Sequence, residues 1–323
     1  MSGEPTYVQL SDGSRLKVWM LGDTDPVKPL LIALHGAPGL SSHTEPLEAY
    51  SFLAKSCRVL IYDARGSGES DLQPPFTDER WIADIDELRS WAKADSIILA
   101  GGSYGAFLAL GYALTFPQRL SGLVLRDAWA CGPRGVLRAL SSILSSSRIT
   151  PDPERQVRLW SGNVQGREDG EKGLAEIVAI YTPEGTEDGN HDHGGAQPLL
   201  SSSSSSPSSN QKQQSAPPPP PAFEGAGDHE LRWETHNAAF SHSVPRFDVR
   251  SRLCEVGAPT LVAVGRHDPI CPVEESEEIH RLVKGSELAI FEKSGHNPPA
   301  DEPERFQSVV DDFLKRRAFA QPS

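Results

Sequence analysis

The sequence predicts an α/β fold, a mostly parallel and doubly wound sheet with an inserted helical cap. Two observations predict it. Short apolar runs of strand length alternate with segments of helical periodicity, as is typical of strands buried on both faces of a parallel sheet. This alternation stops near residue 128 and resumes near residue 248. The chain therefore divides into a first core segment (1–127), a cap (128–247) and a second core segment (248–323).

The predicted elements follow in chain order. Residues 7–10 and 15–21 flank a Ser-Asp-Gly-Ser turn and predict a β-hairpin. The rest of the first core segment is expected to form strands over 30–34, 58–62, 96–100 and 120–125, and helices over 45–55, 78–93 and 103–115. The second core segment is expected to form strands over 260–264 and 288–291, and helices over 273–283 and 303–317.

The cap combines helical patterns with a low-complexity tract. Helices are expected over 135–145, 154–160, 172–181 and 231–240, and no segment has a convincing strand pattern. Between the last two lies the tract 184–228, which holds seven of the 27 prolines and nine serines. Such a composition buries too little apolar surface to offset the entropy of ordering, so this tract is predicted to be disordered with polyproline II character.

Composition and charge exclude several classes of function. The formal net charge is -13, and there is no long Lys/Arg block, which argues against nucleic acid or anionic lipid as a partner. The longest apolar run, residues 30–34, is far too short to cross a bilayer, and residues 1–13 lack a signal-peptide pattern. The four cysteines form no CxxC pair, so we expect free thiols in a cytoplasmic protein, with no metal site.

A G-x-S-x-G pattern marks the candidate nucleophile. Gly101, Ser103 and Gly105 follow a predicted strand directly and precede a predicted helix. A sharp strand-to-helix turn of this kind strains the backbone of the serine and leaves no room for side chains two residues on either side. The serine hydroxyl is then exposed at a helix N-terminus, where developing negative charge is favoured. Ser103 is therefore the predicted nucleophile.

A serine needs a base to take its proton and an acid to orient that base. His296 lies in a Ser-Gly-His-Asn loop after the last predicted strand, and Asp268 follows the strand at 260–264. These are the positions that the chain order nucleophile, acid, histidine requires. Asp127, after the strand at 120–125, is the competing acid, and His242, His267 and His280 are rivals for the base.

An early loop supplies the third component, an oxyanion hole. His35-Gly36-Ala37-Pro38-Gly39 follows the strand at 30–34. An oxyanion hole needs two backbone N–H groups, one from the residue after the nucleophile and one from such a loop. Tyr104 is expected to supply the first and Ala37 the second, because Pro38 has no N–H. His35 is expected to brace the loop.

These motifs together resemble those of the proline iminopeptidase (prolyl aminopeptidase) group of α/β-hydrolases. The motifs with a counterpart here are H-G-G-P-G (His35–Gly39, with Ala37 for the second Gly), D-x-R-G-x-G-x-S (Asp63 to Ser70), G-G-S-x-G (Gly101 to Gly105) and G-R-x-D-x-x-C-P (Gly265 to Pro272). They span most of the core. The turn from Asp63 to Ser70 is expected to be structural. The chemistry requires no metal or organic cofactor.

The resemblance also implies a substrate, a peptide whose free N-terminal residue, typically proline, is released. The family binds the substrate amine with glutamates of the cap, one of them in an E-x-H-Y-F stretch. Glu234-Thr235-His236 resembles that stretch loosely, so Glu234 is the candidate for amine binding, and the aromatic Tyr is absent. The alternatives are an esterase or lactonase acting on a small molecule, and a non-catalytic scaffold protein that kept the fold.

Overall fold

The computed structural model describes residues 4–22, 25–183 and 230–319, and the predicted disordered tract 184–228 lies outside them. Its centre is an eight-stranded sheet in the order β1-β2-β4-β3-β5-β6-β7-β8. The strands are β1 (Thr6–Gln9), β2 (Arg15–Leu21), β3 (Leu30–Leu34), β4 (Arg58–Tyr62), β5 (Ile97–Gly102), β6 (Leu120–Arg126), β7 (Thr260–Gly265) and β8 (Glu287–Phe291). Among these described strands, only the β1-β2 and β2-β4 pairs are antiparallel. The predicted mostly parallel sheet is confirmed.

Helices cover both faces of the sheet because its central strands are apolar on both sides. The core helices are α1 (Thr44–Tyr50), α2 (Asp78–Trp91), α3 (Tyr104–Thr115), α8 (Val273–Leu282), α9 (Pro298–Asp301) and α10 (Pro303–Phe313). Side chains of α2, α3 and α8 pack into one apolar cluster with the sheet, and side chains of α1 and α10 pack into a second. The sheet is therefore doubly wound.

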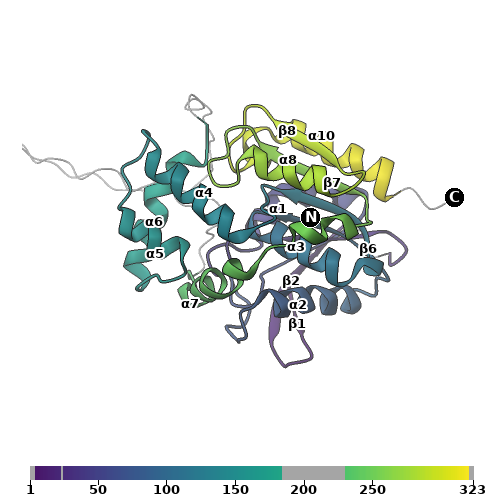
Figure 1. Ribbon diagram of the computed structural model, residues 1–323. Coiled ribbons are helices and arrows are strands. Elements are labelled where there is room, and N and C mark those ends of the chain that lie inside the picture. Colours follow the sequence, from purple (N-terminus) through teal and green to yellow (C-terminus); the bar gives the residue numbers. More distant parts are fainter. Residues whose placement is uncertain (1–3, 23–24, 184–229, 320–323) are drawn as a thin grey trace, which may run out of the picture.

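The cap helices gather at one end of the sheet (Figure 1). They are α4 (Gly132–Ser145), α5 (Pro153–Trp160), α6 (Arg167–Ile177) and α7 (Trp233–Ala238). The chain leaves the core after β6 and returns before β7, and the two crossings lie side by side. Cys131 and Asp248 form an isolated antiparallel bridge there, in which Gly132 N donates to Phe247 O (2.7 Å) and Val249 N to Ala130 O (2.9 Å).

The helix bounds differ from the predicted ones at several ends. The segment 45–55 divides into α1 and a 3₁₀ turn (Ser51–Lys55), and the segment 231–240 divides into α7 and a π-helical turn (Ala239–Ser243). The largest difference is α6, predicted over 172–181 but formed by Arg167–Ile177. Apolar periodicity locates the buried face of a helix but not its first turn, which here carries the charged residues Glu168 and Asp169.

Within the described part of the chain, no helix is both long and apolar enough to cross a membrane.

Candidate active site

Ser103 lies in a strained turn between β5 and α3. Its backbone angles, φ 52° and ψ -121°, are rare for a residue with a side chain. The flanking glycines make the turn possible. A Cβ at Gly101 would lie 2.4 Å from the carbonyl of Gly105, and one at Gly105 would lie 2.7 Å from His35 O. The sequence therefore folds into the sharp turn that the G-x-S-x-G pattern predicts.

His296 and Asp268 meet at the same edge of the sheet. His296 Nδ1 lies 2.8 Å from Asp268 Oδ2, and because a carboxylate only accepts, Nδ1 carries the proton and Nε2 is left as an acceptor. Asp268 Oδ1 in turn accepts from the backbone N–H groups of Ile270 (2.8 Å) and Cys271 (2.9 Å). Both side chains are buried. This arrangement holds the imidazole in one tautomer.

Tyr181 contacts both the cavity beside Ser103 and the loop that carries His296. Its side chain lines a cavity together with Ser103, and its ring lies edge-on to His296 with 5.0 Å between the ring centroids. In addition, Tyr181 O accepts a hydrogen bond from His296 N (2.8 Å). The cap residue Tyr181 therefore connects the histidine loop to the cavity beside Ser103.

The charge distribution at this edge favours proton transfer by His296. Burial by itself would lower the pKa of His296, but the charge of Asp268 and the hydrogen bond to it outweigh burial and raise that pKa. Burial, followed by the nearby Asp268 charge, raises the pKa of the Asp127 carboxyl. Asp268 is therefore the hydrogen-bond partner that raises the pKa of His296, and burial favours the neutral form of Asp127.

The rival residues lie elsewhere or make other bonds. His242 and His267 are exposed, and His280 Nδ1 lies 2.9 Å from Ser286 Oγ. Asp127 is fully buried, but its oxygens accept from Arg126 Nη1 (3.0 Å) and Gly265 N (3.3 Å). Its backbone, like that of Ser103, has a positive φ, 50°. The geometry thus pairs Asp268 with His296.

The predicted oxyanion loop lies directly against the serine turn. A Cβ at Gly36 would lie 3.3 Å from Ser103 Cβ, and Ala37 and Tyr104 line the same cavity as Ser103. Tyr104 is the first residue of α3, so its N–H has no acceptor within the helix. The arrangement therefore places both residues expected to supply the oxyanion hole, Ala37 and Tyr104, at the cavity that Ser103 lines.

The turn from Asp63 to Ser70 forms hydrogen bonds with the predicted oxyanion loop and with His43, which follows that loop. Asp63 Oδ1 accepts from His43 N (2.7 Å), and Gly39 N donates to Ser67 Oγ (2.8 Å). His35 Nε2 accepts from Ala64 N (3.0 Å), so His35 braces the loop as expected. Asp63 and Ser67 are fully buried, and neither lines the cavity beside Ser103.

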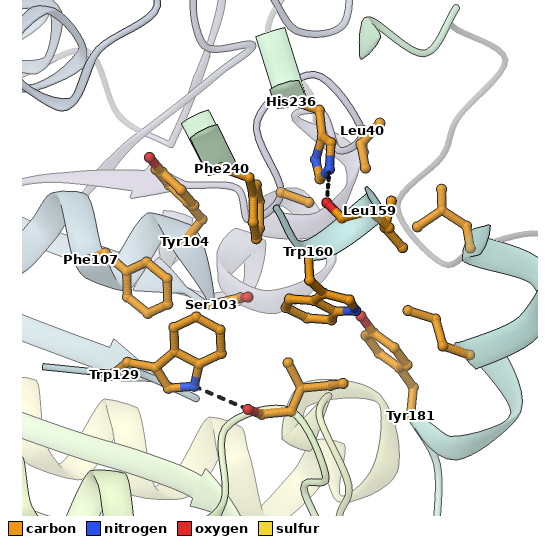
Figure 2. Close-up of a pocket in the computed structure, with 14 residues that line it drawn as sticks. Leu40, Ser103, Tyr104, Phe107, Trp129, Leu159, Trp160, Tyr181, His236 and Phe240 are labelled. Carbon is orange, nitrogen blue, oxygen red and sulfur yellow. Dashed lines mark hydrogen bonds between the residues drawn. The ribbon is translucent and has the colours of Figure 1, made fainter. Parts of the chain in front are cut away.

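The cavity beside Ser103 has a volume of about 50 Å³, and its walls are aromatic and aliphatic side chains (Figure 2). Its aromatic side chains are Tyr104, Phe107, Trp129, Trp160, Tyr181 and Phe240. Among the described residues that line it, none is a carboxylate, Lys or Arg. The lining residue His236 is neutral, because burial lowers its pKa to about 4, and its Nε2 lies 2.9 Å from Leu159 O. The cavity therefore suits an uncharged group.

Glu234, the candidate for binding a substrate amine, lies outside the cavity beside Ser103. The α7 residues Trp233, Thr235 and His236 are buried, whereas Glu234 is exposed and does not line the cavity. The reason is helical geometry, because neighbouring residues on a helix point about 100° apart. Among the residues of the Glu234-Thr235-His236 stretch, His236 is the one that lines the cavity, and amine binding by Glu234 stays a prediction.

Three potential metal ligands lie close together. Donor atoms of Asp268, Cys271 and His296 are all within 4.8 Å of one another. The Asp268–His296 hydrogen bond already accounts for two of them. Burial raises the pKa of the Cys271 thiol well above its usual range, so it stays protonated and binds metal poorly. That no metal is needed remains a prediction.

Several residues of the site carry no sequence signal. The aromatic residues that line the cavity come from segments far apart in the chain. Two of them have a position that the sequence indicates, because Tyr104 follows the predicted nucleophile and Trp129 lies shortly after a strand. The buried ion pair between Glu45 of α1 and Arg126 of β6 was not predicted either. A buried strand that ends in arginine is one signal that could have indicated such a pair, because a buried charge needs a partner.

Comparisons with known proteins agree with this geometry. Residues 29–167 match the family model described as alpha/beta hydrolase fold. A proline iminopeptidase of Pestalotiopsis fici is 28% identical over 295 residues, which cover 90% of this chain and 92% of that protein. A proline iminopeptidase of Heyndrickxia coagulans is 26% identical over 288 residues, covering 88% of this chain and 90% of that one.

Solved structures agree on the fold. A thermophilic esterase from Thermogutta terrifontis aligns with a TM-score of 0.69 at 23% identity, covering 98% of this chain and 100% of that one. A proline iminopeptidase-related protein of Thermus thermophilus aligns with a TM-score of 0.68 at 20% identity, covering 98% and 99%. The chain thus has the α/β-hydrolase fold. In sequence it is similar to the curated proline iminopeptidases over about nine-tenths of its length.

Proposed function

We propose that the protein is a serine hydrolase with Ser103 as its nucleophile. One observation carries the proposal. A serine with a strained backbone lines an apolar cavity, and at the same edge of the sheet a buried histidine is hydrogen-bonded to an aspartate. The three side chains follow different strands, so the sheet itself holds them in position. Arrangements of nucleophile, base and orienting acid are recognised by such geometry.

The proposed reaction is acyl transfer to water. Ser103 Oγ attacks the substrate carbonyl while His296 Nε2 takes the hydroxyl proton, and Asp268 stabilises the imidazolium that forms. The N–H groups of Ala37 and Tyr104 stabilise the oxyanion. The tetrahedral intermediate then releases the amine or alcohol, which receives the proton from His296. Water attacks the acyl-enzyme by the same route and regenerates the serine.

The most specific form of the proposal is an aminopeptidase that releases N-terminal proline or another small residue from peptides. The motif set and the names of the similar enzymes support it. Cavity size supports it too. At roughly 10–15 Å³ per water-sized group, a volume of about 50 Å³ accepts a compact group such as a prolyl ring. An esterase is the second candidate, because no carboxylate to meet a charged amine is found among the described lining residues.

A substrate panel separates the two candidates. We expect prolyl and alanyl arylamides to be cleaved, the prolyl compound with the higher kcat/KM, because its ring is apolar and compact. The measurement compares initial rates for these arylamides with those for short acyl esters. Rapid ester cleavage without detectable arylamide cleavage would identify an esterase or lactonase.

A substitution in the cavity wall is expected to change the kinetics, whereas one on the exposed face of α7 is not. Trp160→Ala is expected to raise KM on the order of tenfold or more, because an aromatic contact with the substrate is lost. Glu234→Gln is expected to leave kcat/KM unchanged, because its side chain is exposed and outside the cavity. Steady-state kinetics on the best arylamide test both variants. A large increase in KM for Glu234→Gln would restore Glu234 as an amine-binding residue.

We also propose that the protein acts in the cytosol. All four cysteines are free, and three of them are buried. Unpaired cysteines are typical of proteins in reducing compartments. Fractionation of cells that express the tagged chain tests this location.

A further inference from the structure

A buried arginine contacts two of the proposed catalytic residues, Ser103 and His296. Arg126 is the last residue of β6 and is 3% exposed. A charge in the interior is costly unless it is paired and hydrogen-bonded, so the partners of its guanidinium indicate its role. Through its side chain, its backbone and its partner Glu45, Arg126 contacts three separate segments, each of which carries one component of the proposed site.

The first contact is with the histidine loop. Arg126 Nη1 donates to His296 O (3.2 Å) and also to Asp127 Oδ2 (3.0 Å). The contact with His296 is to its backbone, so it fixes the loop without competing for the imidazole. The ring of His296 stays free to pair with Asp268.

The second contact reaches the oxyanion loop through Glu45. Arg126 Nη2 is paired with Glu45 Oε1. The other carboxylate oxygen, Glu45 Oε2, accepts from Gly36 N (2.7 Å) and Ser41 Oγ (3.0 Å). Glu45 therefore connects the arginine to both ends of the loop that carries Ala37.

The third contact is with the serine turn. Ser103 N donates to Arg126 O (2.9 Å). The guanidinium also lies against Gly102, where a Cβ would come within 1.9 Å of Arg126 Nη2. Arg126 thus contacts the turn with its backbone and its side chain.

We propose that Arg126, anchored by Glu45, is a positioning residue that sets the serine turn, the oxyanion loop and the histidine loop relative to one another. The inference rests on the proposed function of Ser103 and His296. Arginine suits this role because its planar group offers several donors in fixed directions, whereas lysine offers one compact charge. Catalysis depends on this geometry, and a displacement of about 1 Å can cost on the order of 100-fold in rate.

The test compares Arg126→Met, Arg126→Lys and Glu45→Gln with a matched control. Arg58→Met removes another buried arginine, 5% exposed, which binds the backbone carbonyls of Ala92 (2.9 Å) and Lys28 (3.2 Å) far from Ser103 in the fold. A fluorophosphonate probe reports two quantities. The fraction labelled at saturation counts folded sites, and the labelling rate reports the reactivity of each site.

We expect Arg126→Met to lower the labelling rate and kcat per labelled site on the order of 100-fold, with KM nearly unchanged because the cavity walls remain. Arg126→Lys and Glu45→Gln are expected to lose rate in the same direction and to a smaller extent. Arg58→Met is expected to reduce only the labelled fraction. If Arg126→Met does not fold, Glu45→Gln decides the question alone, because Glu45 is only half-buried.

Two outcomes separate this inference from the function on which it rests. Wild-type labelling at Ser103 together with wild-type rates per site in the Arg126 and Glu45 variants overturns the positioning role and leaves the serine hydrolase standing. A folded wild-type protein that does not react with the probe overturns the proposed function, and the positioning role with it.

Discussion

Ser103→Ala is expected to lower kcat on the order of a million-fold, because removing the nucleophile of a catalytic unit leaves only the contribution of binding and the oxyanion hole. The fold should be unaffected, since Ser103 is half-buried and the strained turn depends on the flanking glycines. The measurement is turnover of the best substrate from the panel, with circular dichroism as the check on folding. Turnover at the wild-type level in the alanine variant would falsify the assignment.

Labelling with a fluorophosphonate probe tests the same assignment, with another serine variant as the matched control. Its phosphorus–fluorine bond breaks as an activated serine oxygen bonds to phosphorus, so an unactivated serine reacts slowly. Wild type and Ser14→Ala, a change to a buried serine of the N-terminal hairpin, are expected to label, and Ser103→Ala is not. A folded wild type that fails to label would instead support the non-catalytic scaffold.

Asp268→Asn is expected to have the second-largest effect, a loss in kcat on the order of 10⁴-fold, because the imidazole loses the partner that fixes its tautomer. The pH profile should also move. Asp268 raises the pKa of His296, so its replacement by a neutral residue lowers that pKa. Since the reaction needs neutral His296, the fall in kcat/KM on acidification should occur at lower pH in the variant than in wild type.

Asp127→Asn is the control for this prediction. It removes a second buried carboxyl beside the same pair, and burial already favours the neutral form of Asp127. Asparagine keeps the shape of that neutral form, so a far smaller loss in kcat is expected. The measurement is kcat/KM against pH for both variants. If Asp127→Asn proves the more damaging change, then Asp127 and not Asp268 orients the histidine.

The sequence predicts the components of the candidate site that follow strand ends. Ser103 comes directly after a strand, and Asp268 and His296 lie in the loops that follow two others, and the apolar run of each strand is visible in the sequence. Parallel strands bring their carboxyl ends to one edge of the sheet, so their approach could be predicted without knowledge of side-chain packing. The hairpin and the order of strands and helices were predictable for the same local reasons.

The parts that escaped prediction depend on packing between distant segments. The cavity brings Leu40, Phe107, Trp160, Tyr181 and Phe240 together from the core and the cap, and no periodicity connects them. The exposure of Glu234 follows from the rotation of a short helix, which a loose motif match does not determine. Likewise, the sequence around Glu45 does not indicate that Glu45 forms an ion pair with Arg126.

The side-by-side crossing at Cys131 and Asp248 makes the cap an exchangeable module. Because the chain leaves and re-enters the core at one point, a longer, shorter or different cap can be accommodated without moving β6 or β7. The entropic cost of a longer connection between fixed ends grows only slowly with its length. A protein engineer could therefore graft the cap of another hydrolase between these two residues, provided that the new cap replaces the hydrogen bond from His296 N to Tyr181 O.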